Sequence, residues 1–341
     1  MIIDAHAHTI APNSWGRYQG QLLHSRGAHG PGKFQVSDDE IAATLTRPVF
    51  GGGSLIEQME KVGTDMQLMS PRPISMSHHE KPERIVHWYI EAINDVIAKQ
   101  CALRPDKFRG VAGLPQNAGV SPANSVEELE RCVKELGFVG CLLNPDPSEG
   151  FSEAPPGLGD EYWYPLYEKM VELDVPALVH STQCGQARVP YTLHFINEES
   201  IAIISLLTSR VFLDFPTLKL VISHGGGAIP YQIGRFRAFY MRRNRRVMDD
   251  EPFEVSLRRL YFETCLYSKE ALELLIKVVG PDRCLFGAER PGTGSEIDPE
   301  TGLWMDDIKP LIDDIEWLTD AERKMIYEDN AKAVHNLKDL P

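Results

Sequence analysis

Four short apolar segments of the chain end in ionisable side chains, although they lie far apart in the sequence. The first segment ends in His6-Ala7-His8, two later ones end in His180 and His224, and the last ends in Glu289. When a parallel sheet closes into a barrel, the carboxyl ends of its strands meet at one rim. Packing does not explain ionisable residues at the same end of four strands. The pattern therefore predicts a barrel with a site at that rim.

Apolar, β-branched runs alternate with amphipathic stretches along the whole chain. Mostly apolar runs such as 218–222 are typical of parallel strands covered on both faces. Eight repeats of a strand and a helix predict one (β/α)8 barrel, a TIM barrel, over residues 1–341, with an open doubly wound sheet as the alternative. The expected strands are Ile2–His8, Met66–Ser70, Phe108–Leu114, Phe138–Asn144, Ala177–His180, Lys219–His224, Tyr261–Cys265 and Cys284–Glu289. The expected helices are Leu55–Val62, Glu83–Arg104, Ser125–Leu136, Tyr162–Leu173, Ser200–Phe212 and Lys269–Val279.

Several segments are not regular in composition. Residues 11–54 contain two of them, Ala11–Asp39 and Arg47–Ser54, and we expect an irregular loop or small insertion over the mouth of the active site. Asn144–Asp160 and Pro291–Asp306 are expected to be further loops. We find no repeat and no linker that divides the chain, so we expect a single domain.

The composition narrows the range of partners. The 341 residues carry a formal net charge of −14, and 43% of them are hydrophobic, which is ordinary for a globular protein. An acidic chain is unsuited to nucleic acid or an anionic membrane as its main partner. The six cysteines are scattered without a CxxC pair, which indicates reduced thiols. We see no signal peptide and no run of 18 apolar residues, and we expect a cytoplasmic protein without a membrane span.

His6, His8 and His180 are the candidate metal ligands. The first two lie two residues apart on a strand, so their side chains point to the same face. Such a pair often occurs by chance, and a lone histidine after a buried strand is more often a core residue. Together, the three imidazoles offer an ion three protein ligands and leave one position for water. We expect one divalent ion per subunit, zinc or alternatively manganese, with Glu289 as a candidate for a further ligand.

His224 and Glu289 are the candidates for proton transfer. His224 is followed by three glycines, which allow the backbone to approach a ligand closely. We expect His224 to move a proton or polarise the substrate, rather than to bind the metal. Glu289 ends the last strand, where a carboxylate beside a metal can act as a general acid or base. A solvated loop carboxylate is the alternative for Glu289.

These strand-end residues resemble the amidohydrolase superfamily, and the resemblance covers essentially the whole chain. It is carried by Asp4-Ala5-His6-Ala7-His8, His180, His224 with its glycines, and the acidic residue that ends strand 8. Within the superfamily, the chain is similar to the branch of aminocarboxymuconate-semialdehyde decarboxylases, aromatic-acid decarboxylases and 4-oxalomesaconate hydratases. The resemblance to the hydratases rests on Ser70-Pro71-Arg72, Leu143-Asn144-Pro145-Asp146-Pro147, Trp163–Met170, His224–Tyr231 and Ile297–Gly302, and on Glu289, where the decarboxylases have aspartate.

The resemblance implies ligands, roles and an assembly. It implies one zinc on the three histidines, with His224 and Glu289 catalytic. Arg235 matches an arginine that in the decarboxylases reaches the site of a neighbouring subunit, which implies a homodimer or a higher homo-oligomer. Arginine suits this task because it binds carboxylates through two parallel hydrogen bonds. The expected substrate-binding residues are Arg47, Arg72, Asn144, Arg235 and Arg290.

Some positions depart from the hydratase pattern. Ser295 stands where the hydratases carry an arginine, while Arg290 directly follows Glu289. Arg47–Ser54 is more similar to the decarboxylases, which use an arginine in that region to hold a carboxylate. These departures leave the identity of the substrate open.

We predict a zinc-dependent hydro-lyase that adds water to an unsaturated oxo-polycarboxylate in the degradation of aromatic compounds. Non-oxidative decarboxylation of an aromatic or muconate-type acid is the first alternative. A hydrolase of a lactone or a C–C bond is the second, and metal binding without catalysis is the third. The fold alone does not decide among them, because a barrel of this type hosts many chemistries.

Overall fold

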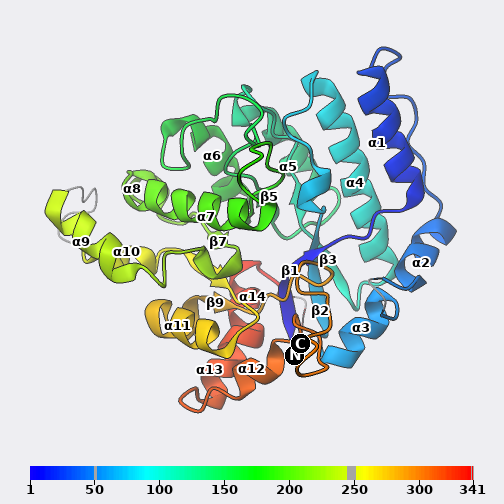
Figure 1. Cartoon of the computed structure of the whole chain (residues 1–341). Helices are drawn as coiled ribbons and strands as arrows, with labels where there is room; N and C mark the ends of the chain where they lie inside the picture. The colour runs from blue at the N-terminus through cyan, green and yellow to red at the C-terminus, as the bar shows by residue number, and fades with distance from the viewer. Residues whose placement is uncertain (50–51, 244–250, 339, 341) are drawn as a thin grey trace.

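Parallel β-strands surrounded by helices form the centre of the molecule, as the computed structural model shows (Figure 1). The structure describes residues 1–49, 52–243, 251–338 and 340. All the strand pairs in this part of the chain are parallel, as the prediction of a (β/α)8 barrel requires. The strands are β1 (Ile3–His8), β2 (Met66–Ser70), β3 (Phe108–Gly110), β4 (Ala112–Gly113), β5 (Cys141–Leu143), β6 (Ala177–Val179), β7 (Leu220–Ile222), β8 (Tyr261–Glu263) and β9 (Cys284–Leu285).

The strands pair in two sheets, β1-β2-β3 and β4 to β9 in sequence order, and backbone hydrogen bonds join the two into a ring. On one side, the Ala5 N–H donates to the Phe286 carbonyl at 2.8 Å, and the Glu289 N–H donates to the His6 carbonyl at 2.8 Å. These bonds connect the first strand to the segment after the last one. The closed barrel, and not the open sheet, is therefore the architecture of this chain.

The other junction lies within the predicted strand Phe108–Leu114, which the structure divides into β3 and β4 at Val111. The Val111 N–H donates to the Met69 carbonyl at 2.9 Å, and the next N–H, that of Ala112, donates to the Gly140 carbonyl at 2.8 Å. The backbone thus changes its hydrogen-bonding partner from one neighbouring strand to the other within two residues. Residues 108–113 therefore form one strand of the barrel, and the hydrogen-bond ladder of this strand is interrupted at Val111.

Helices cover the outside of the barrel, and five of the six predicted helices appear within a few residues of their predicted bounds. None of the helices in the described part of the chain is long and apolar enough to cross a membrane. The helices are α1 (Asn13–Ser25), α2 (Asp38–Thr46), α3 (Leu55–Val62), α4 (Glu83–Leu103), α5 (Val126–Lys134), α6 (Tyr164–Leu173), α7 (Tyr191–Leu207), α8 (Val211–Asp214), α9 (Ile233–Arg243), α10 (Phe253–Leu257), α11 (Lys269–Val279), α12 (Lys309–Asp313), α13 (Asp320–Lys324) and α14 (Asn330–Val334).

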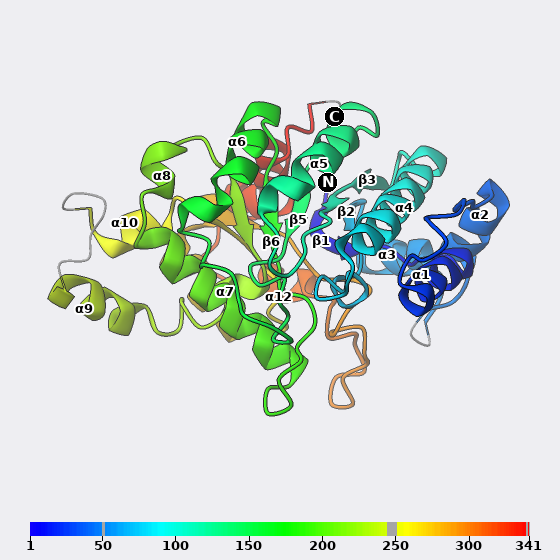
Figure 2. The same ribbon diagram turned by 90° about the horizontal axis from the view of Figure 1, so that it is seen from above.

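The insertion at residues 11–54 differs from its prediction. Its described residues, 11–49 and 52–54, are largely helical, because α1 and α2 occupy much of them, and both helices pack beside α4 at the side of the barrel (Figure 2). Residues 50 and 51 of the predicted segment Arg47–Ser54 lie outside the described residues. Trp15, Leu22 and Ile41 are buried in the same apolar cluster as residues of α4. Burial of these apolar side chains against α4 accounts for the position of the insertion. The loops that do line the active-site cavity include residues 183–184 and 292–296.

Helix α7 begins at Tyr191, nine residues before the predicted start at Ser200. Pro190 precedes its first turn in an extended conformation, which is a favourable position for proline because its missing N–H is not needed there. The earlier start places Phe195 and Glu199 on the buried side of the helix. This side faces the carboxyl ends of the strands and contributes to the site described next.

Candidate metal centre and active site

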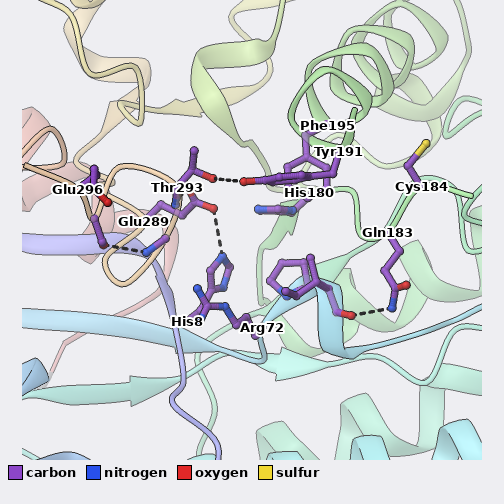
Figure 3. A pocket seen from close by; sticks show the side chains of 14 residues that line it. His8, Arg72, His180, Gln183, Cys184, Tyr191, Phe195, Glu289, Thr293 and Glu296 are labelled. Carbon is purple, nitrogen blue, oxygen red and sulfur yellow. Dashed lines mark hydrogen bonds and ion pairs between the residues drawn. The ribbon is translucent and has the colours of Figure 1, made fainter. Parts of the chain in front are cut away.

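A cavity of about 710 Å³ opens at the carboxyl ends of the strands. Its floor includes His8 from the end of β1, His180 directly after β6, and Glu289 after β9. In Figure 3, Gln183 and Cys184 lie on one side of this group, and the loop after β9 lies on the other. The other residues that line the cavity are Arg72, Pro73, Ile74, Tyr191, Phe195, Gly292, Thr293, Ser295 and Glu296.

The structure brings together the four residues that the sequence predicts as metal ligands. The ring centroids of His6, His8 and His180 lie 4.9 to 5.4 Å from one another. Ligand atoms of these three rings and of the Glu289 carboxylate all lie within 4.8 Å of one another, and all four residues are buried. They come from three different strand ends, so the closure of the barrel assembles the group.

For His8 and His180, hydrogen bonds indicate which ring nitrogen faces the centre. The Ser70 hydroxyl donates to the Ala7 carbonyl, so it accepts from His8 Nδ1 at 2.9 Å. His180 Nδ1 contacts the Ser181 carbonyl, which can only accept. In both rings Nδ1 therefore carries the hydrogen and the Nε2 lone pair is available to an ion. Partners of this kind orient the histidine ligands of metals in proteins.

The three imidazoles are in the form that binds metals. Burial lowers the pKa of His8, and it lowers the pKa of His6 and of His180 well below the usual range for histidine. Neighbouring imidazoles add to this effect for His6 and His180. Neutral imidazole is the species that donates a lone pair to zinc and related ions.

Two further observations fit a divalent ion at this place. His180 Nε2 is buried without a hydrogen-bond partner. His6 Nε2 and His8 Nε2 lie 3.3 Å apart and face each other. Imidazole nitrogens with one carboxylate oxygen form a donor set that suits zinc and also other divalent transition metals. The residues present could therefore hold such an ion.

His224 and Glu289 lie beside this centre, as the sequence predicts. His224 Nδ1 contacts Glu199 Oε1 at 2.7 Å, and His224 Nε2 faces Glu289 Oε1 at 4.0 Å. Glu289 Oε1 also lies 3.8 Å from His8 Nε2. The Glu289 carboxylate thus stands between a candidate ligand and the His224 imidazole.

The charges of this group set its protonation. Burial by itself lowers the pKa of His224, but the charge of Glu199, the hydrogen bond to it and the nearby Glu289 together raise the pKa well above the usual range. For Glu289, burial raises the pKa, but the neighbouring His224 and His8 imidazoles outweigh this effect and hold the pKa well below its usual range. Burial raises the pKa of Glu199 to about 7, although the positive charge of His224 acts to lower it. The arrangement favours a protonated His224 next to an ionised Glu289.

Two more carboxylates lie beneath the histidines. Glu263 Oε1 is 3.3 Å from His6 Nδ1, and its other oxygen accepts the Cys265 N–H at 2.6 Å. Asp4 accepts the N–H groups of His6 at 3.1 Å and of Ala288 at 3.0 Å. Burial raises the pKa of Glu263 to about 8 and that of Asp4 to about 7. A cation at the centre would stabilise the ionised forms of both groups.

Arg72 is the predicted substrate-binding residue that lines the cavity. Its guanidinium is partly buried in the field of Glu289 and donates to a backbone carbonyl of the loop after β9 at 3.5 Å. Asn144 lies deeper, fully buried, and its amide donates to the hydroxyl of a threonine in the loop after β6 at 2.8 Å. Arg47, at the end of α2, donates to a backbone carbonyl of the loop before α1 at 3.2 Å. Neither Asn144 nor Arg47 is among the described residues that line the cavity.

Arg290 and Arg235 also lie outside the described lining of the cavity. The Arg290 side chain is only 1% exposed, because it forms a buried ion pair with Asp306, donates to Gln58 Oε1 at 3.2 Å and lies over the Trp304 ring. Arg290 therefore anchors the loop after β9, contrary to its predicted role as a substrate ligand. Arg235 is exposed on α9, and its contact with a neighbouring subunit stays a prediction.

Sequence reasoning missed the buried carboxylates Glu199 and Glu263. Glu263 ends β8, and an acidic residue inside an apolar strand is a signal that could have found it. Glu199 was hidden because the predicted helix began one residue after it. The loop residue Tyr267, whose hydroxyl contacts Glu289 at 3.1 Å, has no signal in the sequence.

A closed parallel barrel that presents histidines and a carboxylate at its carboxyl rim defines a class of metal-binding α/β-barrel proteins. The sequence matches the amidohydrolase family over residues 3–337, and the chain belongs to that family. This confirms the predicted superfamily.

Comparison with individual proteins points to lyases. The chain is 39% identical to a 2-keto-4-carboxy-3-hexenedioate hydratase of Sphingobium sp. (strain NBRC 103272 / SYK-6), over 98% of this chain and 96% of that protein. It is also similar to the crystal structure of a 4-oxalomesaconate hydratase from Rhodopseudomonas palustris, with a TM-score of 0.86 and 36% identity over 99% and 97% of the two chains. A dihydroxybenzoic acid decarboxylase from Polaromonas sp. JS666, with bound manganese and the inhibitor 2-nitroresorcinol, shares the fold at a TM-score of 0.69 and 22% identity, over 99% and 97% of the two chains.

Proposed function

We propose that this chain is a metal-dependent hydro-lyase that adds water to the conjugated double bond of an unsaturated oxo-polycarboxylate in the degradation of aromatic compounds. The observation that carries the proposal is the position of Glu289, whose Oε1 lies 3.8 Å from His8 Nε2 and 4.0 Å from His224 Nε2. A carboxylate in this position can take a proton from water and pass it on. The 39% identity to a hydratase over nearly the full length supports the same class of reaction.

His6, His8 and His180 would hold one divalent ion, with Glu289 as the fourth protein group at the same centre. Zinc is our first choice, because imidazole nitrogens and one carboxylate oxygen are ligands typical of zinc in enzymes. Manganese is the alternative, and it is bound in the related decarboxylase structure. When bound, a divalent ion lowers the pKa of water and polarises a substrate oxygen.

Glu289 and His224 divide the proton transfers between them. Glu289 is ionised and buried, so it can accept the proton that water loses as its oxygen bonds to the β-carbon of the substrate. The negative charge that develops on the oxo-conjugated system lies next to His224, which its carboxylate neighbours keep protonated. A proton is then returned to the α-carbon, so that H and OH have been added across the double bond.

The cavity provides one cationic and one aromatic wall for the substrate. Arg72 would bind a carboxylate, and the rings of Tyr191 and Phe195, with centroids 5.5 Å apart, would cover the conjugated part. Arg235 would contribute from a neighbouring subunit in a homo-oligomer. We also propose a cytoplasmic location, which agrees with the free thiol state of all six cysteines.

Incubation of the metal-loaded enzyme with 4-oxalomesaconate in ¹⁸O-labelled water tests this proposal. The product is expected to be 18 mass units heavier than the substrate in ordinary water and 20 units heavier in ¹⁸O-labelled water, without release of carbon dioxide. Dihydroxybenzoates serve as alternative substrates. Carbon dioxide release from one of them, with no hydration of the oxo-acid, would replace the proposal by a decarboxylase.

The Glu289→Gln variant tests the assigned base. It is expected to keep its metal, because three histidines remain, and to lose about 10²- to 10⁴-fold in kcat, the usual contribution of a general acid or base. Glu273→Gln, on the outer side of α11, is the matched control. Near-normal turnover by Glu289→Gln would refute the role of this carboxylate.

A further inference from the structure

The two oxygens of the Glu289 carboxylate have different surroundings. Oε1 faces the two imidazoles of the centre. Oε2 faces away from them, toward the Tyr267 hydroxyl at 3.1 Å, the Thr293 N–H at 3.4 Å and the Cys265 thiol at 3.7 Å. A carboxylate with one oxygen held in this way presents the other in a defined direction.

The donors and acceptors around the Tyr267 hydroxyl indicate that it donates its hydrogen to Glu289. A phenol has one hydrogen to donate and can accept two hydrogen bonds. The Gly294 N–H donates to the Tyr267 hydroxyl at 3.2 Å, and the Cys265 thiol contacts it at 3.0 Å and can supply the second donor. The hydrogen of the phenol is then left for Glu289 Oε2, an ionised acceptor closer than the Ala288 carbonyl at 3.5 Å.

The backbone around this contact is built for a close approach. Tyr267 and Glu289 both adopt the left-handed conformation, with φ of 54° and 56°, which is costly for residues other than glycine and persists where the surroundings enforce it. The loop after β9 packs directly on both side chains. A Cβ on Gly294 would lie 2.4 Å from Cζ of Tyr267, and a Cβ on Gly292 would lie 2.7 Å from the carboxyl carbon of Glu289.

We propose that Tyr267 is a positioning residue that holds Glu289 Oε2, so that Oε1 alone faces the reacting atoms. The proposal rests on the function proposed above and deepens it, because it explains how a carboxylate on a loop keeps a single direction. Loss of the phenol hydrogen bond would let the carboxylate rotate and would leave the ring packing intact. Catalysis depends steeply on such orientation, so the effect falls on kcat more than on KM.

The test is a double-mutant cycle of Tyr267→Phe with Glu289→Gln on the metal-loaded enzyme. In the wild-type background, Tyr267→Phe is expected to lower kcat about 10- to 100-fold, the usual contribution of a hydrogen bond to a charged group, with KM within about twofold. In the Glu289→Gln background, the same change is expected to alter kcat less than about twofold. Tyr164→Phe, which removes a bond of 2.6 Å to Asp214 on the outer surface, is the matched control.

Metal content and the melting temperature of each variant are measured alongside kcat, and both are expected to match the wild type. Equal losses in the two backgrounds would show a general structural role and overturn the proposal, as would a kcat within twofold of the wild type for Tyr267→Phe alone. If the wild-type enzyme instead decarboxylates a dihydroxybenzoate, the hydratase function fails, and the same cycle is run on that reaction. The two failures are therefore distinguishable.

Discussion

The ion pair between Glu199 and His224 gives the sharpest quantitative prediction. Glu199→Gln keeps the size of the side chain and removes the negative charge that lies 2.7 Å from His224 Nδ1. The two side chains are only 11% (His224) and 0% (Glu199) exposed, so screening of this charge by solvent is weak. A hydrogen bond to a charged group contributes about 1.5 to 3 kcal/mol, which corresponds to roughly one to two units of pKa.

The sign of the effect follows from the pKa of His224. In the wild type this pKa is raised, so the imidazolium that we assign as the proton donor is present at neutral pH and is lost as the pH rises through the raised value. Removal of the Glu199 charge lowers the pKa of His224. The alkaline limb of the kcat profile is therefore expected to move to lower pH by about one to two units.

The assay is a pH profile of kcat from about pH 6 to 10, a range that covers ordinary histidine and well-raised values. The neighbouring variant Glu198→Gln is the matched control. Burial also raises the pKa of Glu198 to about 7, but this side chain lines a different groove, between α7 and α9. Its profile is expected to match the wild type. An unchanged alkaline limb in Glu199→Gln, or the same shift in both variants, would refute the reasoning.

Two further predictions concern the metal and the substrate. Zinc is added back to the chelated protein at a thousandfold excess over its dissociation constant. It is expected to stabilise the fold by about 4 kcal/mol, which corresponds to about 6 °C in melting temperature for 341 residues. In a calorimetric scan, His180→Asn is expected to abolish most of this shift. A shift that persists in His180→Asn would place the metal elsewhere. Arg72→Met is expected to raise KM for an oxo-polycarboxylate about 10- to 100-fold, while Arg72→Lys loses less, and an unchanged KM would remove Arg72 from substrate binding.

The barrel could be predicted from the sequence because its strands leave a strong local signal. Runs such as β7 are apolar along their whole length, since both of their faces are covered. Two features left no such signal. The change of partner at Val111 is set by backbone hydrogen bonds, and the helical insertion packs on α4 through a few spaced apolar residues such as Trp15 and Ile41. The two glycines within α1 helped to conceal that helix.

The site was predictable where residue type and strand position coincide. A single histidine at the end of a strand does not indicate a metal centre, but histidines at the ends of both β1 and β6 do so together, and the structure brings the ring centroids of His8 and His180 to 5.4 Å from each other. The arginines were harder to assign, because the sequence does not show in which direction a side chain points. Arg290 is adjacent to Glu289 in the chain, yet its guanidinium turns away to pair with Asp306.

Relatives with this fold include hydratases and decarboxylases, so the barrel and its histidines cannot by themselves determine the reaction. In this site, groups from several elements surround one carboxylate. Glu289 is reached by His8 from β1, by His224 after β7, by Tyr267 after β8 and by Thr293 from the loop that follows it. Each of these loops can change without disturbing the packed barrel. A change in one of these loops would therefore alter the surroundings of Glu289 and leave the barrel intact.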